Sequence, residues 1–121
     1  EARLAVSDKY ADVQKLISEL LPEKIDCDRF IITLGLHGSM TFQRESGKVH
    51  RIPAITDQVV DTVGAGDAFF AVAAPLVLAS GSVELAAFLG NVAGAIKVGI
   101  VGHRKAVDKI TLTKFINAVL K

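Results

Sequence analysis

The chain has 121 residues, of which 50% are hydrophobic and 22% charged, a composition that excludes a disordered polypeptide. Its 14 basic and 13 acidic residues leave a formal net charge of +1, and no basic tract is long enough to follow a nucleic-acid backbone. No hydrophobic run reaches the length of a membrane span, and the first residues lack a signal-peptide pattern. We therefore expect one soluble globular domain without nucleic-acid or membrane partners.

The lone Cys27 has no second cysteine to pair with and no metal-ligand spacing around it. We interpret it as an inert, partly buried thiol, which favours a reducing cytoplasm as the compartment. The chain begins at Glu1, without an initiator Met, and enters a helix-like pattern directly. We expect a fragment or a processed chain.

The first predicted element is an amphipathic helix over residues 8–21. It follows Ser7-Asp8, a plausible cap, and we expect Pro22 to end it. The hydrophobic residues at helical spacing are Tyr10, Val13, Ile17 and Leu20. A short β-branched run at residues 30–34 follows and stops at Gly35, which predicts a buried strand and suggests a βα repeat.

A β-hairpin is the next predicted element. Residues 39–44 and 48–52 flank a turn at residues 45–47, where Gly47 can adopt a positive φ. We expect this hairpin at a sheet edge. Residues 68–79 are hydrophobic on nearly every side, so they predict a fully buried helix.

Two more helices complete the predicted order. The first is capped by Ser82, and Gly90 and Gly94 would let another helix approach it closely. Its hydrophobic face comprises Leu85, Leu89, Val92 and Ile96. Residues 99–102 predict a loop. The last helix begins near Thr111 or Thr113 and carries Phe115, Ile116, Val119 and Leu120. With no linker or internal repeat, the pattern predicts one α/β domain.

A glycine-rich turn at residues 64–66 carries the chemistry. Such a turn leading into a helix directs backbone amides and the positive end of the helix dipole at an anion. Gly64 and Gly66 lack side chains, so a phosphate can approach the backbone. The Thr62 hydroxyl and the amides of Gly64, Ala65 and Gly66 would then surround a phosphoryl group in the transition state.

Asp67 stands directly after this turn, where a carboxylate can accept the proton of an attacking hydroxyl. General-base catalysis of this kind contributes about 10²- to 10⁴-fold in rate. We expect Asp61, on the strand side of the turn, to anchor the turn or help hold a cation. The alternative is a plain loop in which Asp67 only caps a helix.

Residues 61–69, DTVGAGDAF, match without departure the signature of the ribokinase (PfkB) family of carbohydrate kinases, which the chain therefore resembles. In that family the glycine turn forms an anion hole and the final Asp, here Asp67, is the catalytic base. Thr33-Leu34-Gly35 with Gly38 is similar to the family's strand end, which contacts the nucleotide phosphates. The resemblance spans essentially the full chain but covers only the C-terminal part of a family member.

The resemblance implies a ribokinase-like three-layer α/β sandwich with central sheet strands, a β-hairpin and flanking helices. Residues 1–121 would be its C-terminal nucleotide-binding and catalytic portion. It also implies ATP and Mg²⁺ as cofactors and phosphoryl transfer to a hydroxyl of a sugar or related small molecule. The loop at residues 98–103, with Asp61 and Val63, matches a segment that holds a monovalent cation in many members, which adds K⁺ as a candidate.

Looser parts of the resemblance concern Asn91 and Glu1. Asn91 falls where the family places a polar residue beside the adenine, and a packing role on its helix is the alternative. Glu1 matches the end of the family's Asn-x-x-Glu motif, which helps place magnesium and phosphate. A frayed, solvent-exposed carboxylate is the alternative for Glu1. We interpret His103 as an ordinary loop residue.

The substrate-recognition region and the lid of the family belong to its N-terminal part, which these residues do not include. The alternative to catalysis is therefore a non-catalytic nucleotide- or phosphate-binding fragment, and the third hypothesis is a packing domain with an incidental glycine turn. The expected partners are a nucleotide and a sugar-like small molecule. Sugars, sugar phosphates and nucleosides all stay open as substrates, as does self-association into a homo-oligomer.

Overall fold

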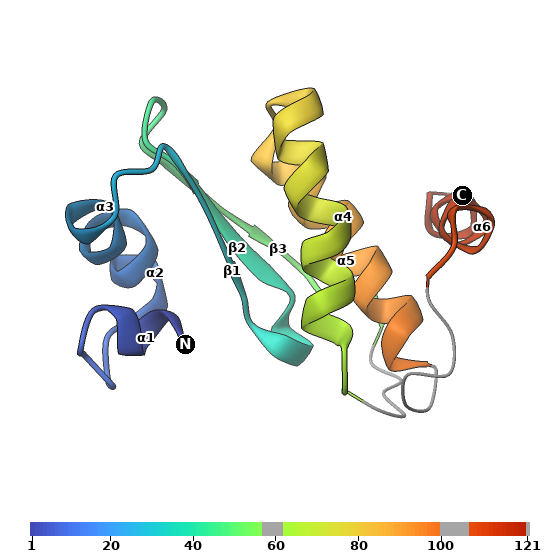
Figure 1. The fold of residues 1–121 in the computed structure, drawn as a ribbon, viewed down its shortest axis with the longest axis horizontal. Helices are drawn as coiled ribbons and strands as arrows, with labels where there is room; N and C mark the ends of the chain where they lie inside the picture. Colours follow the sequence, from blue (N-terminus) through green and yellow to red (C-terminus); the bar gives the residue numbers. More distant parts are fainter. Residues whose placement is uncertain (57–61, 100–106, 121) are drawn as a thin grey trace.

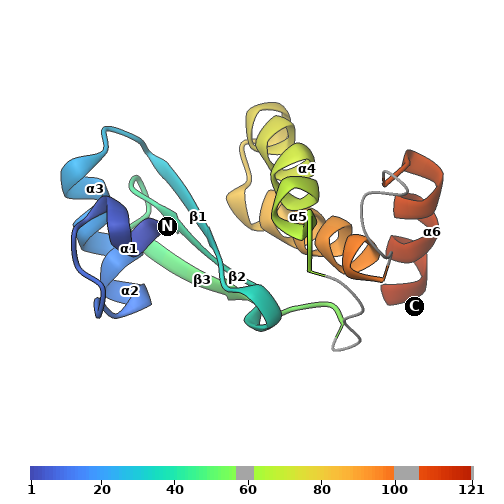
Figure 2. The same ribbon diagram turned by 60° about the horizontal axis from the view of Figure 1, so that its bottom comes forward.

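The computed structural model describes residues 1–56, 62–99 and 107–120. Figures 1 and 2 show helices on both sides of a central sheet. The elements in chain order are α1 (Ala2–Ala5), α2 (Val13–Lys15), a π-helical turn (Leu16–Leu20), α3 (Leu21–Lys24), β1 (Arg29–Thr33), a 3₁₀ turn (Gly35–His37), β2 (Ser39–Gln43), β3 (Lys48–Ile52), α4 (Ala65–Ser80), α5 (Val83–Val98) and α6 (Lys109–Val119).

The described strands form an antiparallel sheet in the order β1-β2-β3. The hairpin is confirmed, with Gly47 at φ 64° in the turn and β3 at the edge. The predicted strand is present as β1, but only Phe30 of its residues is buried, so the expectation of a buried strand is wrong. The suggested βα repeat is wrong for this part of the chain, because β1 pairs antiparallel with β2. The hydrophobic run alone does not distinguish the two arrangements.

The alternation of side chains gives each face of the sheet its own hydrophobic core. Phe30, Met40 and Phe42 pack with the N-terminal helices, as part of a cluster that includes Leu16 and Ile17. A second cluster, formed by Phe69, Ala73, Ala86 and Ala87, belongs to α4 and α5 and contacts the sheet through Ile31 and Ile52. The predicted three-layer α/β arrangement is therefore confirmed.

The first amphipathic helix begins later than predicted. Asp12 is its N-cap, since its side chain accepts hydrogen bonds from the amides of Gln14 (3.0 Å) and Lys15 (3.1 Å). Asp8 instead accepts a bond from the Tyr10 amide at 3.0 Å, and Tyr10 is 87% exposed. A local turn at Asp8 thus uses the carboxylate that the sequence offered as a cap.

Pro22 does not end the helix, in contrast to the prediction. Helical structure continues through α3 to Lys24, with Pro22 in the first turn of α3. The preceding turn widens to a π-helix, in which the Leu21 amide bonds the carbonyl of Leu16. The wider turn shifts the hydrogen bonding by one residue directly before Pro22, which accommodates its missing amide and its ring inside a continuing helix.

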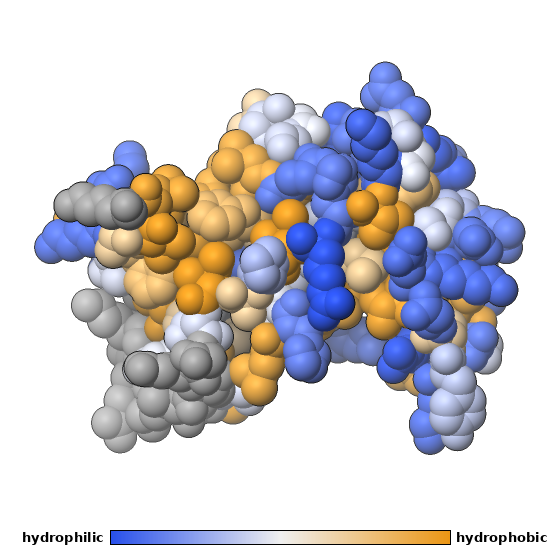
Figure 3. Space-filling model, turned by 180° about the vertical axis from the view of Figure 1, so that it is seen from behind, coloured by the Kyte–Doolittle hydropathy of each residue, from blue (hydrophilic) through white to orange (hydrophobic). Residues whose placement is uncertain are grey.

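Helix α4 is much less buried than its composition predicts. Phe69 and Ala73 are its only buried residues, whereas Phe70 is 72% and Leu78 85% exposed. On the face of the molecule opposite that in Figure 1, hydrophobic residues also gather over the half that contains the C-terminal helices (Figure 3). A helix that is hydrophobic on all sides could be buried on all sides. Which of its sides are buried depends on the elements that pack against it.

Helices α4 and α5 pack closely through a glycine, as predicted. A Cβ added to Gly90 would meet the ring of Phe69 at 2.8 Å, whereas one at Gly94 would meet only the Ala65 carbonyl oxygen at an ordinary 3.6 Å. The predicted cap is also confirmed, since the Ser82 hydroxyl accepts a bond from the Leu85 amide at 3.1 Å. Leu85 itself is 45% exposed, so the buried face of α5 is rotated away from it.

Two further predictions change at the periphery. Helix α6 begins at Lys109, before the expected threonines, because Asp108 caps it through the Thr111 amide at 2.8 Å. Cys27 is exposed rather than partly buried.

Among the described helices none is both long and hydrophobic enough to cross a membrane. The predicted loop at residues 99–102 lies almost entirely outside the described residues, as does His103.

Candidate functional site

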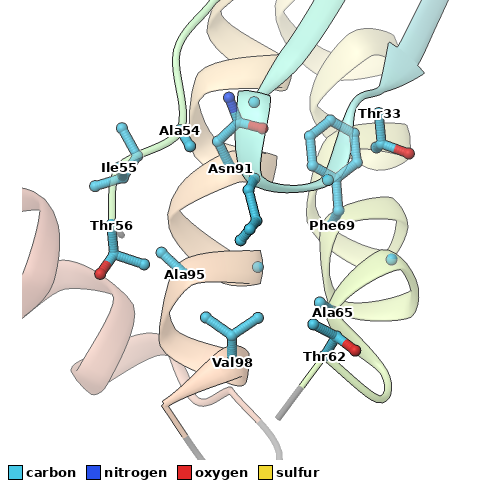
Figure 4. Close-up of a pocket in the computed structure, with 15 residues that line it drawn as sticks. Thr33, Ala54, Ile55, Thr56, Thr62, Ala65, Phe69, Asn91, Ala95 and Val98 are labelled. Carbon is cyan, nitrogen blue, oxygen red and sulfur yellow. The ribbon is translucent and has the colours of Figure 1, made fainter. Parts of the chain in front are cut away.

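A pocket of about 290 Å³ lies where the end of β1, the segment after β3, the start of α4 and one face of α5 meet (Figure 4). It is walled mainly by small and hydrophobic side chains. Seven residues singled out in the sequence line it together, although they are spread over almost sixty positions: Thr33, Gly35, Gly38, Thr62, Ala65, Gly66 and Asn91. The fold thus brings the two glycine motifs and the helix asparagine to one place.

Sequence reasoning did not assign the other lining residues to the nucleotide site: Leu36, Ala54, Ile55, Thr56, Phe69, Gly94, Ala95 and Val98. Of these, Gly94 was expected to pack against a helix and Val98 to begin the loop that holds a cation. Figure 4 shows Ala95 and Val98 following Asn91 along one face of α5. Their spacing of four and seven residues from Asn91 is a signal that could have found them. Residues 54–56 carry no such signal, since they follow a strand and form no regular element.

The glycine-rich turn forms the N-terminus of α4. Gly64 is the N-cap in the left-handed region, at φ 78°, and the Ala65 amide bonds the Thr62 carbonyl at 3.2 Å. Within the described residues, the amides of Gly66 and Asp67 have no backbone acceptor. A Cβ at Gly66 would meet nothing within 4 Å. The turn therefore leaves open backbone and free donors at the positive end of a 16-residue helix.

Asp67 lies in the first turn of α4, next to the pocket rather than in its wall. Its side chain is exposed, and its neighbour Gly66 lines the pocket. Gly64 and Val63 lie outside the lining, with Val63 51% exposed. Asp61 lies outside the described residues, as does most of the loop proposed to hold a monovalent cation.

Gly35 and Gly38, the two glycines of the motif that follows β1, are needed for different reasons. Gly35 has φ 59° and open space where a side chain would be, so its backbone is accessible from the pocket. Gly38 has φ 84°, and an added Cβ would lie 2.1 Å from the Ile52 carbonyl oxygen and 2.6 Å from the Ala54 nitrogen. The chain's own backbone therefore demands a glycine at position 38.

Asn91 is 8% exposed, and its side-chain amide is occupied by the protein itself. The Nδ2 group donates to the carbonyl oxygens of Ile52 at 3.3 Å and Pro53 at 3.0 Å. Because carbonyl oxygens only accept, these contacts fix which side-chain atom is the nitrogen. The Nδ2 group is thereby engaged with the protein's own backbone, and Oδ1 can only accept a bond.

Glu1 lies far from this pocket in the fold. It is the exposed N-cap of α1, and the N-terminal helices lie on the opposite side of the sheet from α4 and α5 (Figures 1 and 2). Among the described residues no group of three acidic, His or Cys side chains could hold a metal ion. A metal at this site would thus depend on ligands other than such a cluster.

Comparison of the fold with solved structures defines its class. The E. coli phosphofructokinase-2 in complex with potassium superposes with a TM-score of 0.82 at 19% identity, over 100% of this chain and 39% of that one. The Arabidopsis thaliana ribokinase complexed with ribose and ATP gives 0.80 at 23% identity, over 95% and 38%. The fold is therefore ribokinase-like.

Sequence comparison then identifies the family. The model of the pfkB family of carbohydrate kinases matches residues 1–110, and the chain belongs to this family. The bifunctional protein HldE of Psychromonas ingrahamii is 35% identical over 82 residues, 68% of this chain and 17% of the relative. HldE of Vibrio cholerae is 33% identical over 100 residues, 81% of this chain and 21% of the relative. The chain thus spans about a fifth of the length of these curated relatives.

Proposed function

We propose that residues 1–121 are the C-terminal nucleotide-binding and catalytic portion of a carbohydrate kinase, which transfers the γ-phosphoryl group of ATP to a hydroxyl of a sugar or related small molecule. Membership of the pfkB family supports the reaction class. The observation that carries the proposal is the open glycine turn, Gly64 to Gly66, at the edge of a pocket that also contains the end of β1.

In this proposal the pocket binds the base of the nucleotide, and the glycine turn binds its phosphates. The hydrophobic part, between residues 54–56 and α5, suits a flat base, because stacking and burial require few polar groups. At about 290 Å³ it holds only part of ATP. The phosphates would extend toward the free amides of Gly66 and Asp67, and toward Gly35 and Thr33 across the pocket.

Asp67 is the general base in this proposal. Its carboxylate takes the proton of the acceptor hydroxyl while that oxygen forms a bond to the γ-phosphorus and the bond to the β,γ-bridging oxygen breaks, which releases ADP. The amides of the turn stabilise the charge on the transferred phosphoryl oxygens. The exposed position of Asp67 beside the pocket leaves room for an acceptor on its outer side.

Magnesium would arrive with the nucleotide. Mg²⁺ commonly binds through substrate phosphates with one or two carboxylates, so a dedicated protein cluster is not required. The described residues, which lack such a cluster, fit this mode. Glu1 as a magnesium and phosphate residue, Asp61 and Val63 as a K⁺ site, and a cytoplasmic location stay predictions.

A second candidate function is nucleotide or phosphate binding without catalysis. It is supported by the pocket and the amides of Gly66 and Asp67, which suit a phosphate whether or not an acceptor hydroxyl is held beside Asp67. An acceptor that is not held against Asp67 would lose the alignment that supplies much of the catalysis. The two candidates share the same pocket and differ in whether turnover occurs.

The test combines calorimetry with ATP and a phosphotransfer assay on a panel of sugars, sugar phosphates and nucleosides. Binding with turnover supports the kinase, and binding without turnover supports the second candidate. Failure to bind ATP would refute both. In whichever form of the protein turns over, Asp67→Asn should lower kcat at least about 100-fold with nearly unchanged ATP affinity. Glu45→Gln, an exposed acid in the hairpin turn, is the matched control and should leave kcat unchanged.

A further inference from the structure

One wall of the pocket is a segment that the sheet does not hold. Strand β3 ends at Ile52, and the following residues Ala54, Ile55 and Thr56 line the pocket opposite α5 (Figure 4). Strand pairing stops with the partnership of Ile52 and Ser39. The position of this wall segment, residues 53–56, therefore depends on contacts from other elements.

Helix α5 provides the first of these contacts through Asn91. Its Nδ2 group donates to two successive carbonyl oxygens, those of Ile52 and Pro53, at the point where the chain leaves the sheet. Two bonds from one planar amide fix both the distance and the direction of the backbone there. Since Asn91 is 8% exposed, water does not readily replace them.

The turn between β1 and β2 provides the second contact, from Gly38. Its backbone lies so close to the Ile52–Ala54 backbone that the position has no room for a Cβ. The Gly38 carbonyl in turn accepts a bond from the Leu34 amide at 2.7 Å, which ties this approach to the end of β1. The start of the wall segment is thus held between α5 and the motif that carries Thr33 and Gly35.

We propose that Asn91 is a positioning residue for the nucleotide, which sets the pocket wall at residues 53–56 against α5 and the glycine motif rather than recognising the base with its own amide. This rests on the proposed nucleotide site. Asn91 and Gly38 both contact the backbone at residues 52–54. The asparagine thereby couples the width of the base pocket to the position of the glycine motif that faces the phosphates. The Nδ2 group of Asn91 faces this backbone, and the Oδ1 atom can serve a ligand only as an acceptor.

Substituting Asn91 by Asp separates positioning from direct recognition. Asn91→Asp keeps an acceptor oxygen for a base but loses both donors to the wall, whereas Asn91→Leu is similar in size and loses both functions. Ala87→Gly is the matched control, because Ala87 is a fully buried residue of α5 in the cluster with α4 and lies outside the pocket lining. It destabilises the same helix without touching the wall.

The measurements are limited proteolysis without nucleotide, with cleavage sites mapped by mass spectrometry, and calorimetric ATP affinity, on the full chain and each variant. We expect both Asn91 variants to be cleaved faster within residues 53–56 by a non-specific protease and to bind ATP at least about tenfold more weakly. Ala87→Gly should not speed cleavage within residues 53–56 relative to the rest of the chain, and should leave ATP affinity within about threefold. Unchanged cleavage within residues 53–56, or wild-type ATP affinity in Asn91→Asp, would overturn the proposal. If the wild-type chain bound no ATP, the proposed function would fail, whereas the cleavage data would still support or overturn the role of Asn91 in holding the wall.

Discussion

The close approach of Phe69 in α4 to Gly90 in α5 gives a quantitative prediction. An added Cβ would lie 2.8 Å from two ring atoms of Phe69 and 3.0 Å from a third, the ring carbon next to the side-chain stem. That ring is 8% exposed, so it cannot simply swing away. Overpacking of this kind costs about 1–3 kcal/mol, while replacing Gly by Ala in a helix gains about 1 kcal/mol.

Gly94→Ala is the matched variant, one helical turn further along α5. Its Cβ would make only an ordinary contact, 3.6 Å from the Ala65 carbonyl oxygen. The helix-propensity gain is common to both variants and cancels in their difference, so Gly94→Ala should unfold with a free energy about 1–3 kcal/mol higher than Gly90→Ala. Urea titrations followed by circular dichroism measure this. Equal stabilities for the two variants would refute the packing argument.

Three further stability predictions follow from single contacts. Gly38→Ala should lose about 3 kcal/mol or more because its Cβ would overlap backbone, whereas Gly35→Ala should lose only the left-handed strain, about 1–2 kcal/mol, in the same urea titration. Thr41→Val should gain about 1 kcal/mol, since the Thr41 hydroxyl is buried without a partner among the described residues; a loss would show that it has one. Asp12→Ala should lose about 1 kcal/mol of capping, whereas Asp8→Ala should stay within about 0.5 kcal/mol; equal losses would contradict the helix start.

The elements set by short-range pattern could be predicted well. The strand at β1, the hairpin with Gly47 and the cap at Ser82 each depend on residues a few positions apart. Local sequence is therefore sufficient to predict them. The start of the first helix was missed because two acids, Asp8 and Asp12, compete for the same role. Only the surrounding turn decides between them.

The chemistry of the glycine turn was likewise visible in the sequence, since Gly64, Gly66 and Asp67 form one continuous motif at a helix start. The family match agrees with the reaction class that this motif indicated. The pocket beside it was not predictable in full. Its wall at residues 54–56 has no periodicity or motif, and Asn91 and Gly38, which contact the start of this segment, come from distant parts of the chain.

The sequence by itself thus determined most of the element order, the glycine turn at the start of a helix and the family resemblance, because each rests on local spacing. Tertiary structure alone decided which hydrophobic positions are buried, as the exposed Phe70 and Leu78 of α4 show. It also decided that the Asn91 amide faces backbone carbonyls and that Gly38 is required by close backbone approach. The physical reason is that burial and hydrogen-bond partners belong to pairs of segments, and those pairs form only when the chain has folded.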